Sequence, residues 1–388
     1  MSQNYKDESN SKLLIIHAGA DKCASSSLQS SLGVLNKRHP ELQDYQFLRN
    51  NLLLKKNDPK AEEKDEYIRS IFRDTSSNSL IVSNEGLMGE SLPSLKLLCK
   101  TALEDHNFEQ VIITMYTRSP ASHAISSYHQ WHFRSKETLK NDIKITNGIG
   151  LNSNQLTPLE RRLITIFSKS QSRNWYSIVS AIKAETNEFG EKVRLISNHI
   201  PTKENNYSLL YDFLNSTTII DKYAHISLSD FDKRSNDRFA TELTHALSIV
   251  LCDYSRSDIF APGPHELNHF LMALSLAYKE SENSFNENLN QAYAGSQQNL
   301  KQLAYSIDEI AREGTTKYCK EFGLNTEQFF QVNADIELPT IDYISKNTSK
   351  RDGNDIKEFN LECVEKLSRV QKKIMNNVTW MQFAKKIF

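Results

Sequence analysis

The sequence predicts an α/β fold with a central parallel sheet flanked by helices, followed by a mainly helical C-terminal region. The sheet is predicted by four short, mostly apolar runs, and runs without polar alternation are typical of strands buried on both faces. These runs lie at 13–16, 80–83, 111–116 and 193–196. Beyond residue 264 the chain is rich in helix formers and has no further strong strand pattern. We expect a loose N-terminal tail over 1–11, an α/β domain over 12–260 and a helical extension over 265–388.

The first apolar run, Leu13 to Ile16, leads through a tight connection into a helix. The apolar residues at helical spacing are Leu28, Leu32 and Leu35. Ser25 to Ser27 offer capping hydroxyls at the start of this helix, Pro40 follows its end, and Lys22 stands at its mouth. A strand, a short loop and a helix N-terminus direct backbone N–H groups and the helix dipole toward one point. Together with the lysine they favour an anion there, most naturally a phosphate.

The spacing around Lys22 decides between kinds of phosphate loop. An ATPase P-loop has a second glycine directly before its lysine, whereas Asp21 stands there in this chain, which disfavours an ordinary nucleoside triphosphatase. The stretch resembles instead the 5′-phosphosulfate loop of sulfotransferases that use 3′-phosphoadenylyl sulfate, Gly-x-x-Lys-x-Gly-Thr-Thr-Ser-Leu-Gln. The residues that fit are Gly19, Lys22, Ser25, Ser26, Ser27, Leu28 and Gln29. Ala24 replaces the family's glycine, and alanine costs free energy there if the backbone takes a positive φ.

A second motif follows the strand predicted over 111–116. In the same sulfotransferases a strand leads into Arg-x-Pro, with a serine eight residues after the arginine and often a tyrosine two further on, and this motif binds the 3′-phosphate. The matching residues are Arg118, Pro120, Ser126 and Tyr128. His123 stands where many members have a second arginine. A guanidinium and a hydroxyl two turns into the next helix can converge on one phosphate; the alternatives are a surface ion pair and a backbone-bonded hydroxyl.

Three residues are candidates for the general base. Glu85 follows the strand predicted over 80–83, where open α/β sheets place functional groups, and this segment is similar to the Ser-x-Glu of bacterial carbohydrate sulfotransferases. Glu85 could equally orient Lys22 or cap the next helix. His129 and His132 follow the second motif; a histidine suits proton transfer near neutral pH, although packing among aromatic neighbours is the commoner role.

The resemblance implies a P-loop-NTPase-like three-layer fold and a sulfotransferase that moves a sulfuryl group to an acceptor hydroxyl, with a carbohydrate or glycoconjugate as the expected acceptor. It implies that Lys22 stabilises the bridging oxygen, that Arg118 and Ser126 bind the 3′-phosphate, and that no metal is required. The residues implied to hold the 5′-phosphate through backbone N–H groups or hydroxyls are Gly19, Cys23, Ala24, Ser25, Ser26 and Ser27. The alternatives are a non-catalytic nucleotide-binding, glycan-binding or scaffold protein on the same fold, and a degenerate P-loop kinase.

The composition narrows the partners. Lysine and arginine (47) balance aspartate and glutamate (48), so no overall positive charge draws the chain to nucleic acid or acidic membranes. The 5 cysteines are scattered without Cys-x-x-Cys spacing, which favours reduced thiols over a zinc site and predicts a cytoplasmic protein. No apolar run reaches the length of a membrane span, and the polar N-terminal residues do not predict a signal peptide.

The remaining segments carry local predictions. Arg134–Thr157 is polar and poorly periodic, which predicts a surface loop or an acceptor-binding lid. A helix beginning at Trp175 is expected to stop at Phe189-Gly190. In the C-terminal extension, helices are predicted around Leu267–Tyr278 and Phe359–Ile374. The resemblance covers roughly residues 12–252, and the chain has no counterpart to the Arg-Lys-Gly loop that covers the nucleotide in many members.

Overall fold

The computed structural model describes the chain over 12–19, 23–73, 75, 78–170, 173–200, 208–231, 241–252, 289, 291–330 and 341–376. The chain forms two compact units, each assembled from separate stretches. Unit 1 comprises Met1–Ser119, Asn174–Asp237 and Arg312–Gln331, and unit 2 comprises Pro120–Arg173, Arg238–Ala311 and Val332–Phe388. These units differ from the predicted division near residue 260, because the predicted 12–260 domain contributes to both. Among the residues described, no helix is long and apolar enough to cross a membrane.

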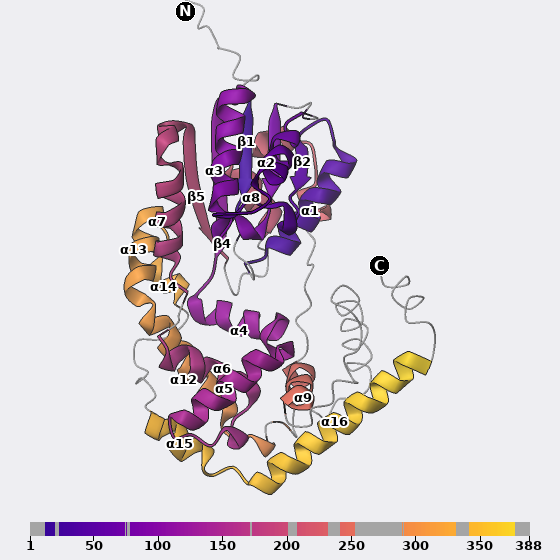
Figure 1. Cartoon of the computed structure of the whole chain (residues 1–388), viewed down its shortest axis with the longest axis vertical. Coiled ribbons are helices and arrows are strands. Elements are labelled where there is room, and N and C mark those ends of the chain that lie inside the picture. The colour runs from indigo at the N-terminus through magenta and orange to yellow at the C-terminus, as the bar shows by residue number, and fades with distance from the viewer. Residues whose placement is uncertain are drawn as a thin grey trace, which may run out of the picture. The chain divides into compact units, whose positions relative to one another are not determined.

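A parallel sheet lies at the centre of unit 1 (Figure 1). The strands are β1 (Leu13–His17), β2 (Asp44–Phe47), β3 (Ser79–Ser83), β4 (Gln110–Thr117) and β5 (Val193–His199). Their order is β2-β3-β1-β4-β5. In the register, Ile15 lies between Ile81 and Ile112, and all three are fully buried. The structure thus confirms the predicted α/β class and the strands at all four apolar runs.

Strand β2 was not predicted from the sequence. Asp44–Phe47 nevertheless pairs in parallel with β3. This strand lies at the edge of the sheet, with a partner on one side only, and Phe47 is half exposed. A short edge strand in which polar and aromatic residues alternate lacks the apolar run that identifies a central strand.

Helices cover the sheet of unit 1. They are α1 (Ser25–Arg38), α2 (Ala61–Ser70), α3 (Leu92–Lys100), α7 (Trp175–Thr186), α8 (Leu209–Ser216), α13 (Arg312–Phe322) and α14 (Thr326–Phe329). The β1–β2 and β3–β4 connections run in opposite directions across the sheet, so right-handed crossovers put α1 on one face and α3 on the other. Accordingly α1 packs with α8, whereas α3 packs with α2 and α7.

Two helix ends in unit 1 differ from the prediction. The α-helix that begins at Trp175 ends at Thr186, before the expected Phe189-Gly190 stop, and continues as a 3₁₀ stretch over Asn187–Lys192. Within that stretch Gly190 has a φ of 56°, so the glycine still makes the break in the helix. The second difference is the start of α1, where Ala24 and not a serine is the N-cap.

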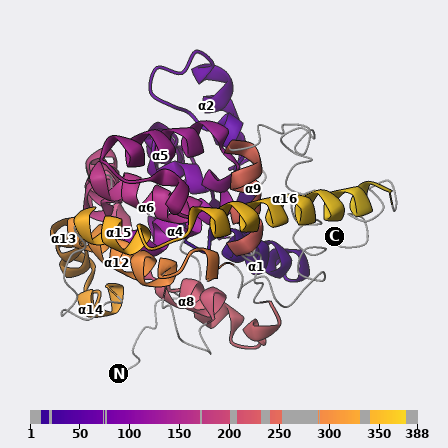
Figure 2. The ribbon, with the colours of Figure 1, turned by 90° about the horizontal axis from the view of Figure 1, so that it is seen from below.

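Unit 2 is helical over its described residues. It contains α4 (Pro120–Gln130), α5 (Lys136–Gly148), α6 (Pro158–Ser168), α9 (Thr241–Cys252), α12 (Ser296–Ile310), α15 (Ile341–Thr348) and α16 (Gly353–Asn376). Helix α6 packs against α5 and α12, and α16 packs against α9 (Figure 2). The predicted C-terminal helix is confirmed, with Phe359, Cys363 and Leu367 buried. The helix predicted around Leu267–Tyr278 lies outside the described residues.

The surface loop expected over Arg134–Thr157 is wrong for most of its length, because α5 occupies Lys136–Gly148. The side chain of Ser135 caps this helix by accepting a hydrogen bond from the backbone N–H of Thr138. Its buried face includes Asp142 and Thr146. Polar residues on the buried face remove the apolar periodicity by which a helix is recognised in a sequence.

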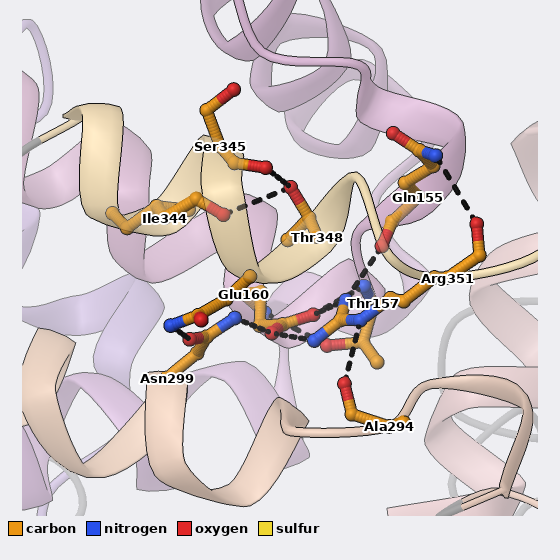
Figure 3. Close-up of polar contacts among 10 residues, drawn as sticks. Gln155, Thr157, Glu160, Ala294, Asn299, Ile344, Ser345, Thr348 and Arg351 are labelled. Atoms are coloured by element: carbon orange, nitrogen blue, oxygen red, sulfur yellow. Dashed lines mark hydrogen bonds and ion pairs between the residues drawn. The ribbon is translucent and has the colours of Figure 1, made fainter.

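A buried ion pair joins three separate segments of unit 2 (Figure 3). The Arg351 guanidinium donates to both carboxylate oxygens of Glu160, at 2.8 and 2.9 Å, and both side chains are fully buried. The same carboxylate accepts from the side-chain amide of Asn299 at 3.0 Å and from the backbone N–H of Thr157 at 2.7 Å. The Nε of Arg351 donates to the Ala294 carbonyl. This arrangement satisfies the charges and fixes the α6 N-terminus to the segment before α16.

Candidate functional site

The strand order of unit 1 locates a candidate site at the carboxyl edge of the sheet. The connection leaving β1 crosses toward β2, and the connection leaving β4 crosses toward β5, so the chain diverges between two adjacent strands. In open α/β sheets, ligands bind outside the carboxyl ends of the strands at such a point. The segments that follow β1, β3 and β4 at this edge carry Gly19, Glu85 and Arg118. Three predicted site residues from separate parts of the chain therefore belong to one edge.

Helix α1 begins at this edge with an unusual backbone. Its N-cap residue is Ala24, in the left-handed region with φ 62° and ψ 13°, and it makes no side-chain cap hydrogen bond. The expected capping by Ser25 to Ser27 is wrong, because these serines are the first three residues inside the helix. The N-cap therefore lies one residue before Ser25, the first of the serines that the hydroxyl pattern suggested.

This helix start retains the features of an anion site. The first backbone bond within α1 runs from Leu28 N to Ala24 O at 3.0 Å, so the backbone N–H groups of the first turn lie at the open end of the helix. Ser26 and Ser27 are half-buried, whereas Cys23 and Ser25 are buried. Lys22, together with Ala20 and Asp21, lies outside the described residues.

Gly19 lies in a close contact that excludes any side chain. A Cβ atom at this position would lie 2.3 Å from Ser25 Oγ and 2.7 Å from His17 Nε2. Both distances are far below van der Waals contact, so a side chain at position 19 would displace Ser25 Oγ and the His17 ring. The structure thus supplies a steric reason for the glycine that the sequence reasoning assigned to the phosphate loop.

His17 lies against Gly19 and was not predicted as a site residue. It is fully buried, and its Nδ1 lies 2.8 Å from Ser83 Oγ, which also accepts a hydrogen bond from Gln29 Nε2 at 3.2 Å. Burial lowers the pKa of His17 to about 4, so the imidazole is neutral at pH 7. The available signal in the sequence was a single polar residue at the end of an otherwise apolar strand.

Glu85 faces the first turn of α1. The Ser26 hydroxyl lies 3.5 Å from Glu85 Oε1, and Glu85 is half-buried. Glu85 opens a short 3₁₀ helix, Glu85–Met88, whose N-cap Asn84 accepts from the backbone N–H of Gly86. The Asn84 side-chain amide also donates to the carbonyl of Leu48, at 2.8 Å. A carboxylate in this setting can accept a proton from a hydroxyl group brought to the edge of the sheet.

Arg118 follows β4 at the same edge and is half-buried. Its carbonyl oxygen accepts a hydrogen bond from the Trp175 indole Nε1 at 2.8 Å. The preceding residue, Thr117, bonds through its hydroxyl to Tyr318 of α13 at 2.9 Å. Neither aromatic partner was predicted from the sequence, because Trp175 lies 57 positions from Arg118 and Tyr318 lies 201 positions from Thr117.

The other predicted site residues belong to unit 2. Ser126 is half-buried on α4. His129 is buried, with its Nδ1 3.2 Å from Thr244 Oγ1 of α9 and its ring edge against Tyr128. His132 opens a short 3₁₀ helix after α4 and is half-buried. His123, at the position of the family's second arginine, is buried on α4.

Two further findings bear on the site. Within the part of the chain that the structure describes, no group of three or more histidine, cysteine or acidic side chains is arranged to hold a metal ion. Comparisons of the chain with protein family models, with curated proteins and with solved structures found no match.

Proposed function

We propose that this chain is a sulfotransferase that transfers the sulfuryl group of 3′-phosphoadenylyl sulfate to an acceptor hydroxyl of a carbohydrate or glycoconjugate, on a P-loop-like α/β fold. The observation that carries the proposal is the meeting of Gly19, the α1 N-terminus and Glu85 at the carboxyl edge of the sheet, on the edge that also carries Arg118. Gly19, the α1 N-terminus, Glu85 and Arg118 each belong to a sequence segment that is similar to a segment of this family. The strand order puts all four at the carboxyl edge of the sheet, where open α/β sheets bind ligands.

The residues at this edge fit the donor. The glycine turn and the first N–H groups of α1 suit the 5′-phosphate, because they combine close backbone approach with the positive end of a 14-residue helix. The Arg118 guanidinium suits the 3′-phosphate as a planar fork of donors. The roles of Lys22 and Ser126 rest on the resemblance alone.

The proposed transfer is direct. The acceptor oxygen bonds to sulfur while the bond from sulfur to the bridging phosphate oxygen breaks, and the adenosine bisphosphate leaves with the electron pair. Glu85 takes the proton of the acceptor hydroxyl, and Lys22 neutralises the charge on the bridging oxygen. We propose Glu85 rather than His129 as the base, because the Glu85 carboxylate faces the first turn of α1, whereas His129 is buried in unit 2 beside Thr244.

Titration calorimetry tests the donor site. Adenosine 3′,5′-bisphosphate, 5′-AMP and ATP are titrated into the wild-type chain and into Arg118→Ala, Lys22→Ala and a control, Arg194→Ala. Arg194 is exposed on β5 of the same unit, so its removal deletes a guanidinium away from the proposed site. We expect selective binding of the bisphosphate, retained in the control and lost in Arg118→Ala. Equal binding of all three nucleotides, or none, would refute the proposal.

The proposed base is tested separately with a panel of sugar acceptors and labelled donor. Replacing Glu85 with glutamine keeps the size of the side chain but removes the proton acceptor. We expect Glu85→Gln to bind the bisphosphate normally and to lose about 10²-fold or more in kcat. Full activity of this variant would show that another group takes the proton.

A further inference from the structure

The backbone at Arg118 is held by two aromatic side chains that the proposed chemistry does not use. The Trp175 indole donates its single N–H to the Arg118 carbonyl oxygen at 2.8 Å. Trp175 is fully buried as the first residue of α7, so its ring cannot turn toward another acceptor in water. The peptide group that follows Arg118 therefore has a fixed orientation.

Thr117, the residue before Arg118, is held by hydrogen bonds to Asn198 and Tyr318. The Thr117 hydroxyl donates to the carbonyl of Asn198 at 3.3 Å, and Tyr318 lies 2.9 Å from the same hydroxyl. Because the single proton of the threonine points to the carbonyl, Tyr318 donates to the threonine oxygen and Ser197 donates to Tyr318. Tyr318 is fully buried, and burial raises the pKa of its phenol, which keeps the donated proton in place.

The two helices that supply these aromatic residues are themselves closely packed. Asn174, the N-cap of α7, lies so near α13 that a Cβ atom on Gly314 would lie 2.8 Å from its Oδ1. A side chain at position 314 would therefore displace the Asn174 amide that caps α7. Trp175 and Tyr318 thus come from one packed pair of helices within unit 1.

We infer that Trp175 and Tyr318 are positioning residues that direct the Arg118 side chain, and that they set the preference of the site for a nucleotide with a second phosphate. The inference rests on the proposed function. With the peptide groups around Arg118 fixed, its Cα–Cβ bond has one direction, so less freedom is lost when the guanidinium engages an anion. Loss of either hydrogen bond lets the strand end move and misplaces the guanidinium, while the contacts to the 5′-phosphate remain.

The test measures affinity for adenosine 3′,5′-bisphosphate and for 5′-AMP in Trp175→Phe and Tyr318→Phe. Each variant keeps the apolar ring and deletes one donor. The control is Tyr223→Phe, which removes another buried tyrosine hydroxyl of unit 1, the one that donates to Gln43. We expect the ratio of the two affinities to fall about 5-fold in both variants and to stay unchanged in the control, with 5′-AMP binding within twofold of wild type.

The outcomes are separable. If the wild-type chain prefers the bisphosphate, Arg118→Ala abolishes that preference, and both aromatic variants keep it, the positioning role is refuted while the proposed function stands. If the wild-type chain binds both nucleotides equally, the proposed function fails and the inference fails with it. Should Tyr318→Phe not fold, Thr117→Val deletes the other partner of the same hydrogen bond, and an unchanged affinity ratio in that variant refutes the role of Tyr318.

Discussion

The substitution Ala24→Gly tests the backbone strain at the start of α1. Ala24 has a φ of 62°, a conformation that costs an alanine about 1–2 kcal/mol relative to the right-handed region. Glycine adopts this conformation without that cost, but it raises the entropy of the unfolded chain, which offsets about 0.5–1 kcal/mol. We therefore expect the variant to raise the free energy of unfolding by about 0.5–1 kcal/mol.

The assay is urea unfolding followed by far-UV circular dichroism, with Ala184→Gly as the matched control. Ala184 is exposed in the interior of α7, where the same change is expected to destabilise by about 1 kcal/mol. Opposite shifts of the two midpoints would support a left-handed Ala24. A urea midpoint for Ala24→Gly that is lowered as much as that of the control would refute the left-handed conformation of Ala24.

Three further predictions concern the described contacts. Glu160→Ala leaves the buried Arg351 guanidinium without its carboxylate, so urea unfolding should show a loss of about 3–5 kcal/mol, and a loss below 1 kcal/mol would contradict the buried pair. The folded-state pKa of His17 is about 4, against an ordinary 6.5, so the unfolded chain binds the proton first as the pH falls. The free energy of unfolding should therefore decrease by up to about 3 kcal/mol between pH 6.5 and pH 4. In unfolding measured at several pH values, His17→Gln should flatten this dependence, and His225→Gln, at an exposed position, should not. Gly19→Ala places a Cβ 2.3 Å from Ser25 Oγ and should weaken bisphosphate binding in calorimetry. Affinity within twofold of wild type would show that Gly19 does not lie as close to Ser25 as described.

The sequence predicted the elements whose patterns are local. The central strands are continuous apolar runs with buried neighbours on both sides, and α1 carries apolar residues at helical spacing, so composition and periodicity were enough. Gly19, Glu85 and Arg118 each lie within three residues of the end of a predicted strand, so their place after the strands followed from the same patterns. The sequence reasoning also anticipated a cost for alanine at position 24 if its φ were positive, and the structure shows that φ.

Features that depend on distant partners were decided by the tertiary structure. Edge strand β2 has no apolar run of its own and exists because it pairs with β3. Helix α5 buries the Asp142 carboxylate, and this burial is tolerated because the Arg162 guanidinium lies 3.2 Å from its Oδ1. The chain reaches Arg351 191 residues after Glu160, and no local pattern links the two.

The division into two units shows the same limit of local patterns. Helix α13 is helical by its own sequence, yet its assignment to unit 1 depends on Tyr318 burying its ring in the core of that unit and bonding to Thr117, 201 positions earlier. Local sequence determined the central strands and the helices that carry an apolar stripe, because hydrophobic periodicity and backbone preference act over a few residues. Only the folded chain decided which helices share a core, because burial and hydrogen-bond satisfaction depend on every partner that packing brings together.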